Sequence, residues 1–210
     1  MTFWNDQVVP RFTDKMLSSR EVMKHRARIT NGLHGEVVEI GFGSALNVPS
    51  LPAAVTTMYA VDPSLVARQL GAERVAASPV DVKFIGLDGA SLPLADASVD
   101  TALSTFTLCT IPDAAAALRE VRRVLKPGGT FHFLEHGLSS DPGVAHWQHR
   151  FNGIQQRIAG GCHLDRPIDQ MVLDAGFEMT SLSHDELAGP KFMRPWSYLY
   201  EGVATRSEPA

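Results

Sequence analysis

The sequence contains only two cysteines, Cys109 and Cys162, among its 210 residues. Two thiols are too few for the disulfide framework of a small secreted domain and are typical of reduced cysteines, so we expect a cytoplasmic protein. Basic residues are also few, because 19 Lys and Arg stand against 23 Asp and Glu, a formal net charge of −4. A sequence-independent nucleic-acid binder needs a basic face, so we do not expect nucleic acid as a partner.

Long apolar runs and repeats are absent as well. No stretch approaches the ~18 apolar residues that a membrane-spanning helix requires, and the first residues do not form a signal peptide. Contact with a membrane surface and the oligomeric state stay open. The composition, with 44% hydrophobic and 20% charged residues, is typical of one soluble domain.

Short apolar runs punctuated by glycine and proline follow one another from Glu36 onward. Five of them predict buried strands: Val37–Ile40, Thr57–Val61, Val82–Leu87, Val99–Phe106 and Thr130–Leu134. Helical patterns such as Asp113–Lys126, which ends at Pro127-Gly128-Gly129, alternate with them. This alternation predicts an α/β fold in which helices cover both faces of a mostly parallel sheet. Two later runs, Met179–Ser183 and Trp196–Val203, predict a closing hairpin.

The N-terminal region has a different pattern from the rest of the chain. Val8, Phe12 and Met16 recur at helical spacing, which predicts one or two amphipathic helices over the sheet edge. We therefore expect residues 1–35 to form a helical cover and residues 36–205 to form the α/β domain, within a single domain overall.

A glycine turn follows the first predicted strand, and we expect a helix after it. Gly41 and Gly43 let the backbone turn sharply and approach a ligand closely, although a short Gly-x-Gly also occurs in ordinary turns. Asp62 ends the next strand about 20 residues later, where a carboxylate can accept two hydrogen bonds from a ribose. Asp88, after the third strand, can accept a bond from an adenine amine.

These elements, taken in this order over about Glu36 to His136, resemble a class I S-adenosylmethionine (SAM)-dependent methyltransferase. The resemblance implies a Rossmann-like sheet of seven strands in the order 3-2-1-4-5-7-6, with strand 7 antiparallel. It implies SAM as the cofactor and S-adenosylhomocysteine (SAH) as the product. The resemblance implies that the following residues bind the cofactor: Glu39, Gly41, Phe42, Gly43, Asn47, Asp62, Pro63, Asp88, Gly89, Ser104 and Thr105.

Within that set, the family pattern implies that Glu39 and the glycines hold the methionine end of SAM. Asp62 then holds the ribose, and Asp88 with Gly89 holds the adenine. Many family members carry a third glycine where this sequence has Ala45, so we expect a slightly reshaped turn. The missing glycine and the absence of a Tyr-x-x-x-Lys pair weigh against the alternative of an NAD-dependent oxidoreductase. A non-catalytic SAM-binding protein is a further alternative.

A narrower resemblance links five downstream motifs to the small methyltransferase-like alkyl thiol S-methyltransferases. The motifs are Ser104–Thr110, Phe133–His136, Trp147-Gln148, Gly161–Arg166 and Arg194–Trp196. The resemblance implies methylation of a small lipophilic acceptor, with a thiol as one candidate. Quinone and phospholipid methyltransferases share the general pattern, so O- or C-methylation of a phenol, quinol or lipid head group is the alternative.

Glu135 and His136 end the fifth strand, and ligands bind at the carboxyl ends of strands in such sheets. The pair is our candidate for catalysis by proton transfer, with ordering of the next loop as the alternative role. We expect Cys109, Trp147, Cys162, His163 and Trp196 to line the acceptor pocket, roofed by the N-terminal helix and Gly143–Leu164. His146 and His149 lack further ligands at metal-binding spacing, so no metal is predicted.

Overall fold

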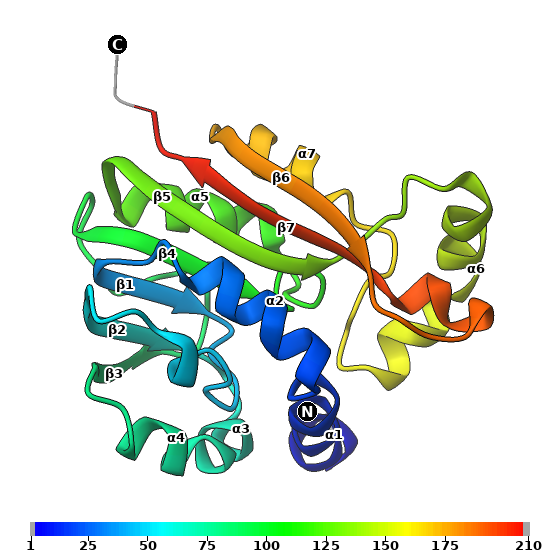
Figure 1. Ribbon diagram of the computed structural model, residues 1–210, viewed down its shortest axis with the longest axis horizontal. Helices are drawn as coiled ribbons and strands as arrows, with labels where there is room; N and C mark the ends of the chain where they lie inside the picture. The colour runs from blue at the N-terminus through cyan, green and yellow to red at the C-terminus, as the bar shows by residue number, and fades with distance from the viewer. Residues whose placement is uncertain (1–2, 208–210) are drawn as a thin grey trace.

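The computed structural model describes residues 3–207, whose centre is a seven-stranded sheet in the order β3-β2-β1-β4-β5-β7-β6 (Figure 1). The strands are β1 (Gly35–Ile40), β2 (Val55–Val61), β3 (Asp81–Gly86), β4 (Val99–Thr105), β5 (Leu125–His136), β6 (Glu178–Glu186) and β7 (Tyr198–Thr205). The pairs from β3 to β5 are parallel, and β7 is antiparallel to both of its neighbours. The predicted strand order and the predicted antiparallel strand are confirmed.

Helices cover both faces and the carboxyl ends of the strands. They are the π-helix η1 (Trp4–Val8), α1 (Val9–Leu17), α2 (Arg20–Thr30), the 3-10 helix η2 (Val48–Ser50), α3 (Leu65–Leu70), α4 (Ala72–Ala76), α5 (Ala114–Val124), α6 (Pro142–Ile158), α7 (Ile168–Asp174) and the 3-10 helix η3 (Lys191–Trp196). No helix among residues 3–207 is both long enough and apolar enough to cross a membrane.

One face of the sheet packs against α5 and α7. The side chain of Asp113 begins α5 by accepting a hydrogen bond from the Ala116 amide at 2.9 Å. Leu118 and Val121 of that helix are fully buried with Ile168 of α7 in the larger hydrophobic cluster. The helix ends at Val124, before the predicted Lys126, because the backbone becomes extended at Leu125 and enters β5.

The opposite face is covered by α2, which crosses the sheet (Figure 1) instead of lying over its edge as the sequence pattern predicted. Ile29 packs with Leu103 of β4 and Leu134 of β5 in the second hydrophobic cluster. Polar contacts add to this packing, because Arg28 donates two hydrogen bonds to the Glu201 carboxylate of β7, at 2.9 and 3.1 Å. The predicted place over the sheet edge was wrong because α2 buries polar as well as apolar side chains against the sheet. The sequence pattern took only the apolar residues as buried.

The helix that we expected after the glycine turn is absent from this described segment. After Gly43 the chain forms turns and only the short 3-10 helix η2. Two prolines explain the difference: Pro49 fits the first turn of a helix, but Pro52 lacks an amide hydrogen and disfavours the helical conformation of Leu51. Leu51 accordingly has an extended backbone, with ψ of 131°.

Candidate active site

The candidate site lies where the parallel strands end. In Figure 1 the arrowheads of β1 and β5 point toward the end of the molecule at which the N-terminal helices and α6 are found. Glu39 lies one residue before the end of β1, Asp62 follows β2, Thr105 ends β4 and His136 ends β5. The topology thus brings together side chains that are up to about a hundred positions apart, at the edge where open α/β sheets bind ligands.

The glycine turn is held by backbone hydrogen bonds from the neighbouring strand. The amides of Gly41 and Phe42 both donate to the Val61 carbonyl, at 2.8 and 3.1 Å. Gly41 has a φ of +70°, and a side chain there would lie 1.8 Å from the Thr107 hydroxyl, so only glycine fits. Gly43 has a φ of +56°, and a Cβ atom placed on it would have no neighbouring atom closer than 3.8 Å. This leaves room for a ligand beside the turn.

Ala45 takes the place of the third family glycine and adopts the left-handed conformation that glycine favours, with φ of +61°. Its methyl group is buried, at 1% exposure. Phe106, directly after β4, is also left-handed at +55°. Both residues border the site, and backbone strain of this kind costs on the order of 1–3 kcal/mol and concentrates at functional sites.

Asp62 is fixed in place by backbone amides. Its Oδ2 accepts from Gly43 at 2.8 Å and its Oδ1 from Ser64 at 2.7 Å, while burial raises the pKa of the carboxyl. A carboxylate offers about four acceptor positions, so both oxygens can still bind hydroxyl groups. Asp88 lies two residues after the end of β3, where its Oδ1 accepts from the Ala90 amide at 2.9 Å.

Asn47 joins two of the predicted cofactor residues by hydrogen bonds. Its amide nitrogen donates to Glu39 Oε1 at 2.5 Å and to Thr105 Oγ1 at 2.9 Å. All three side chains are buried. Ser104, also predicted to bind the cofactor, donates to Glu135 Oε1 at 2.7 Å.

Arg26 of α2 completes this buried group, and the sequence analysis missed it. Its Nη1 donates to Asn47 Oδ1 and to Thr105 Oγ1, both at 2.8 Å, and its guanidinium lies 5.3 Å from the centre of the Phe106 ring. Burial lowers its pKa to about 10, so it is charged at neutral pH. The sequence offered only a cluster of basic residues at the end of a helix, without a sign that one of them turns inward.

Arg26 Nε and Glu39 Oε2 are the two buried side-chain atoms without a hydrogen-bond partner among the described residues. They belong to the same buried group and have opposite polarity. Burial also raises the pKa of Glu39 to about 8. A buried donor and a buried carboxyl oxygen, both left open within one group, fit a ligand with one anionic and one cationic group, such as a free amino acid.

Both carboxylate oxygens of Glu135 accept hydrogen bonds from the end of β4 and from the loop that follows it. Its Oε1 accepts from Ser104 Oγ and from the Thr107 amide at 3.0 Å, and its Oε2 from the Cys109 amide at 3.4 Å. Burial raises the pKa of this carboxyl, although these hydrogen bonds oppose the shift. This geometry favours the loop-ordering role for Glu135 over proton transfer to a substrate.

His136 is buried between η3 and the segment after α6. Its Nε2 lies 3.3 Å from the Pro195 carbonyl, and its Nδ1 lies 4.0 Å from Cys162 Sγ. The loop segments of the two cysteines also meet, because the His163 amide donates to the Cys109 carbonyl at 2.7 Å. The structure therefore brings three predicted acceptor-pocket residues, Cys109, Cys162 and His163, next to the predicted catalytic pair.

The other two predicted pocket residues belong to an aromatic stack. Trp147 and Phe151 of α6 have ring centres 5.5 Å apart, and Phe151 stacks on Trp196 of η3 at 5.4 Å. Trp196 also donates to Gln155 at 3.0 Å. Trp147 is the outermost member of the stack, with 47% of its surface exposed.

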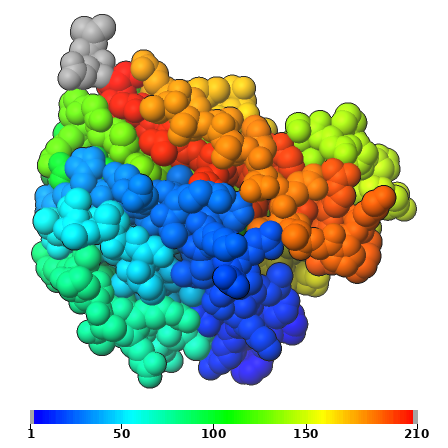
Figure 2. All heavy atoms as spheres, viewed as in Figure 1, coloured from blue at the N-terminus to red at the C-terminus, as the bar shows by residue number. Residues whose placement is uncertain are grey.

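The N-terminal segment reaches the far end of α6. Trp4 Nε1 donates to the Ile158 carbonyl at 2.8 Å. In Figure 2 the blue N-terminal residues lie beside the yellow ones that end α6. Large apolar side chains are about half exposed or more on η1, α1, α6 and η3: Trp4, Phe12, Met16, Ile154, Ile158 and Phe192.

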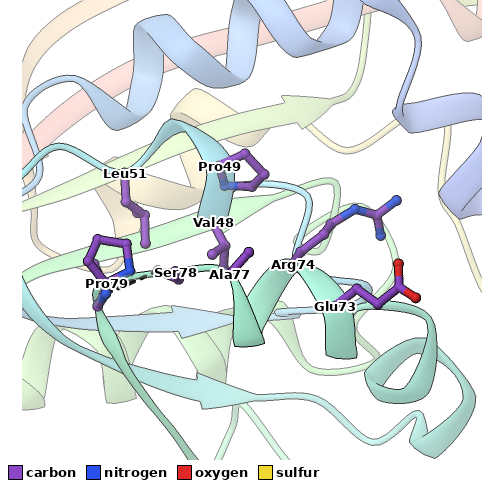
Figure 3. Close-up of a pocket in the computed structure, with 9 residues that line it drawn as sticks. Val48, Pro49, Leu51, Glu73, Arg74, Ala77, Ser78 and Pro79 are labelled. Atoms are coloured by element: carbon purple, nitrogen blue, oxygen red, sulfur yellow. Dashed lines mark hydrogen bonds between the residues drawn. The ribbon is translucent and has the colours of Figure 1, made fainter.

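A pocket of about 460 Å³ lies elsewhere, between η2 and α4 (Figure 3). Its lining consists of Val48, Pro49, Leu51, Glu73, Arg74, Ala77, Ser78, Pro79 and Val80. The predicted cofactor and acceptor residues are not in this lining. Arg74 donates to the Ser44 carbonyl at 2.8 Å and to Asp14 at 2.9 Å. This side chain therefore helps to hold the backbone directly after the glycine turn.

Within the part of the chain that the structure describes, no group of three or more His, Cys, Asp or Glu side chains is arranged to hold a metal ion. His149 pairs with Asp165 at 3.1 Å, and His146 packs against the Trp147 ring.

The sequence profile of a family described as a methyltransferase domain matches residues 38–133. Thiol S-methyltransferase TMT1B of Rattus norvegicus is 30% identical over 176 residues, which cover 80% of this chain and 71% of that protein. The human thiol S-methyltransferase TMT1A is 33% identical, but the match covers 51% of this chain and 45% of that protein. A demethylmenaquinone methyltransferase of Corynebacterium urealyticum is 31% identical over 57% of this chain and 50% of its own length.

Solved structures share the fold. A SAM-dependent methyltransferase from Thermotoga maritima has a TM-score of 0.68 at 19% identity, with 97% of this chain and 98% of that chain covered. A geranyl diphosphate methyltransferase in complex with SAM has a TM-score of 0.65 at 13% identity, over 88% of this chain and 84% of that chain.

Proposed function

Because the chain belongs to the class I SAM-dependent methyltransferases, with thiol S-methyltransferases among its relatives, we propose that it transfers the methyl group of SAM to the sulfur of a small lipophilic thiol. The bound cofactor supplies an electrophilic methyl group on a sulfonium centre. The protein has to hold the acceptor in line with that methyl group and exclude water.

The cofactor residues divide by the part of SAM that they suit. Glu39 Oε2 and Arg26 Nε are open and buried, so they suit the ammonium and the carboxylate of the methionine end. Asp62, whose oxygens keep acceptor capacity, suits the ribose hydroxyls. Asp88 suits the adenine, and Leu87 beside it, 64% exposed, offers apolar surface to the ring.

A thiol is favoured because the side chains that could act as a base, Glu135 and His136, are already held by contacts within the protein. Glu135 accepts hydrogen bonds on both oxygens from Ser104 of β4 and from the loop after β4. His136 is bound by Pro195 on one side and lies beside Cys162 on the other. A thiol has a pKa near 8.5 and reacts as its thiolate, so it needs less help from a base than a phenol or a carbon acceptor.

The roof over the acceptor also forms part of this proposal. We take residues 1–35 as the cover of the methyltransferase domain at 36–205, meeting α6 through the hydrogen bond from Trp4 to Ile158. The aromatic stack of α6 and η3 supplies one wall, and Cys109 borders the inner end. Apolar side chains at the rim suit a lipophilic acceptor, since small-molecule sites are mostly apolar.

The test is a methyl-transfer assay with labelled SAM against matched sets of alkyl thiols, phenols and quinols. Rapid labelling of thiols, with about 100-fold slower labelling of alcohols of the same size, supports the proposal. Labelling of quinols alone would overturn it. Binding of SAM and SAH without any transfer would identify a non-catalytic SAM-binding protein.

C-methylation of a quinol is the second candidate, and the demethylmenaquinone methyltransferase relative supports it. Its base would be His163, because burial lowers the pKa of this histidine and keeps it neutral at pH 7. His163→Asn then separates the two candidates. The substitution should leave thiol turnover within about twofold but lower quinol turnover by about 100-fold.

A further inference from the structure

Cys109 and Cys162 are far apart in the sequence, but the segments that carry them meet in the fold, and each thiol shifts the pKa of the other. The backbone holds this contact, since the amide next to Cys162 donates to the Cys109 carbonyl at 2.7 Å. Both cysteines are free thiols, and they are the only cysteines of the chain. Formation of a bond between them therefore requires little movement of the backbone.

His136 is oriented to activate one of the two sulfurs. Its Nε2 faces the Pro195 carbonyl, which can only accept a hydrogen bond, so Nε2 carries the hydrogen. The Gln148 amide fixes the same carbonyl by donating to it at 3.1 Å. Nδ1 of the neutral ring is then an acceptor, and it lies 4.0 Å from Cys162 Sγ. His136 can thus take the proton of the Cys162 thiol.

The surrounding charges assign different roles to the two sulfurs. The pKa of Cys162 is lowered well below that of an ordinary thiol, first by the hydrogen bond from Cys109 and then by His136. The pKa of Cys109 is raised, because it donates that hydrogen bond and is buried. Arg166 lies close enough to both sulfurs to interact with their negative charge. Cys162 is partly exposed and Cys109 is buried, so reagents reach Cys162 first.

We propose that Cys109 and Cys162 form an oxidisable dithiol site, in which Cys162 attacks low-molecular-weight disulfides and Cys109 then closes an intramolecular disulfide. This proposal does not rest on the proposed methyl transfer, because it depends only on the two thiols and His136.

The reaction balances without any further reagent. His136 takes the proton of the Cys162 thiol, the thiolate attacks one sulfur of a disulfide RSSR, the S–S bond of the reagent breaks, and the leaving RS⁻ takes the proton from His136. Cys109 Sγ then attacks Cys162 Sγ, and its proton goes to the second leaving thiolate. Two cysteine thiols are oxidised by two electrons in total, and one disulfide is reduced to two thiols.

The resulting bond would act on the candidate active site. The Cys109 amide donates to Glu135, and the Cys162 segment follows α6, so a disulfide would tie the loop after β4 to the end of the roof helix. We expect the oxidised protein to bind SAH as the reduced protein does and to lose acceptor turnover. This last consequence rests on the proposed function.

The experiment treats the folded protein with oxidised glutathione at pH 7 and follows it by intact-mass and peptide mass spectrometry. The wild type should lose two hydrogens, with the two cysteine peptides linked, and dithiothreitol should reverse the change. Cys109→Ala should stop at one glutathione on residue 162. Cys162→Ala should react at least about tenfold more slowly than the Cys109→Ala protein.

Two controls keep the result specific. His136→Gln should slow the first step about fivefold or more, whereas His149→Gln, at an exposed histidine of α6, should not change it. In denaturant the two cysteines should react at equal rates.

The inference is overturned if Cys109 reacts first, if the wild type keeps a stable glutathione adduct, or if the disulfide links two chains. Disulfide formation in a protein without transferase activity would instead refute the proposed function alone.

Discussion

At the scale of the residue, the buried pair Arg26 and Glu39 dominates the electrostatics of the site. Glu39 has a pKa raised to about 8 by burial, so its carboxyl is mostly protonated at pH 7 in the unliganded protein. In the unfolded chain this group has an ordinary pKa near 4.5. The folded state therefore binds more protons between these two values, and the unliganded protein should lose stability as pH rises through that range.

The first prediction concerns proton release on binding. The ammonium group of SAH favours the charged form of Glu39, so binding at pH 7 should release close to one proton. Calorimetry in buffers of different ionisation enthalpy measures this number directly. Glu39→Gln should reduce it to near zero, and an equal proton count in both proteins would contradict this role for Glu39.

A second prediction concerns Arg26. Arg26→Ala removes the donor for a carboxylate from a buried place, so SAH affinity should fall by about 2–3 kcal/mol, roughly 30- to 150-fold. Arg28→Ala on the same helix is the matched control, because Arg28 is half-exposed and pairs with Glu201. Adenosine lacks the methionine part and should bind both variants equally. A similar loss for SAH in the two variants would exclude a specific role for Arg26.

At the scale of the element, the sequence pattern predicted most strands and helices but misplaced two features. The alternation of apolar runs was sufficient to predict β1 to β5, because each of these parallel strands carries apolar side chains that pack within the sheet. The pattern wrongly predicted a helix after Gly43, because Pro52 disfavours the helical conformation there despite the helical spacing of the apolar residues. It also failed for α2, because Arg26 and His25 look like surface residues in a linear pattern and are buried at 3% and 4% exposure.

The third prediction tests the N-terminal elements as part of the roof. Deleting residues 1–11 removes η1, the start of α1 and the hydrogen bond from Trp4 to Ile158, but leaves Arg26 and α2. Turnover of the acceptor, as kcat/KM, should fall about tenfold or more because water enters and the acceptor is less well held. SAH affinity and the melting temperature should stay close to those of the full chain. Unchanged turnover, or loss of the folded state, would count against the roof.

At the scale of the whole molecule, the proposed cofactor site links the helix α2 on one face of the sheet to the ends of three parallel strands. Arg26 comes from the helix on one face, Glu39 from β1, Thr105 from β4 and Asp62 from the end of β2. A ligand that bridges these groups should stabilise the fold as a unit, because it binds the native state and not the unfolded chain.

The fourth prediction is therefore a shift in melting temperature. SAH at 100 times its dissociation constant should stabilise the native state by about 2.7 kcal/mol, which corresponds to roughly 5–10 °C for a chain of this length. NAD at the same concentration should leave the melting temperature unchanged. A shift with NAD and none with SAH would contradict the assignment of the cofactor.

The sequence by itself determined the order of elements, the glycine turn and the positions of Asp62 and Asp88 after their strands. Each of these features depends on residues that are close together in the sequence. The tertiary structure alone decided that Arg26 enters the buried group of Glu39, that Glu135 orders the loop after β4, and that the segments of Cys109 and Cys162 meet. These contacts link positions from 13 to 53 residues apart. Burial and pairing at such separations follow from how helices pack on the sheet, which no local pattern records.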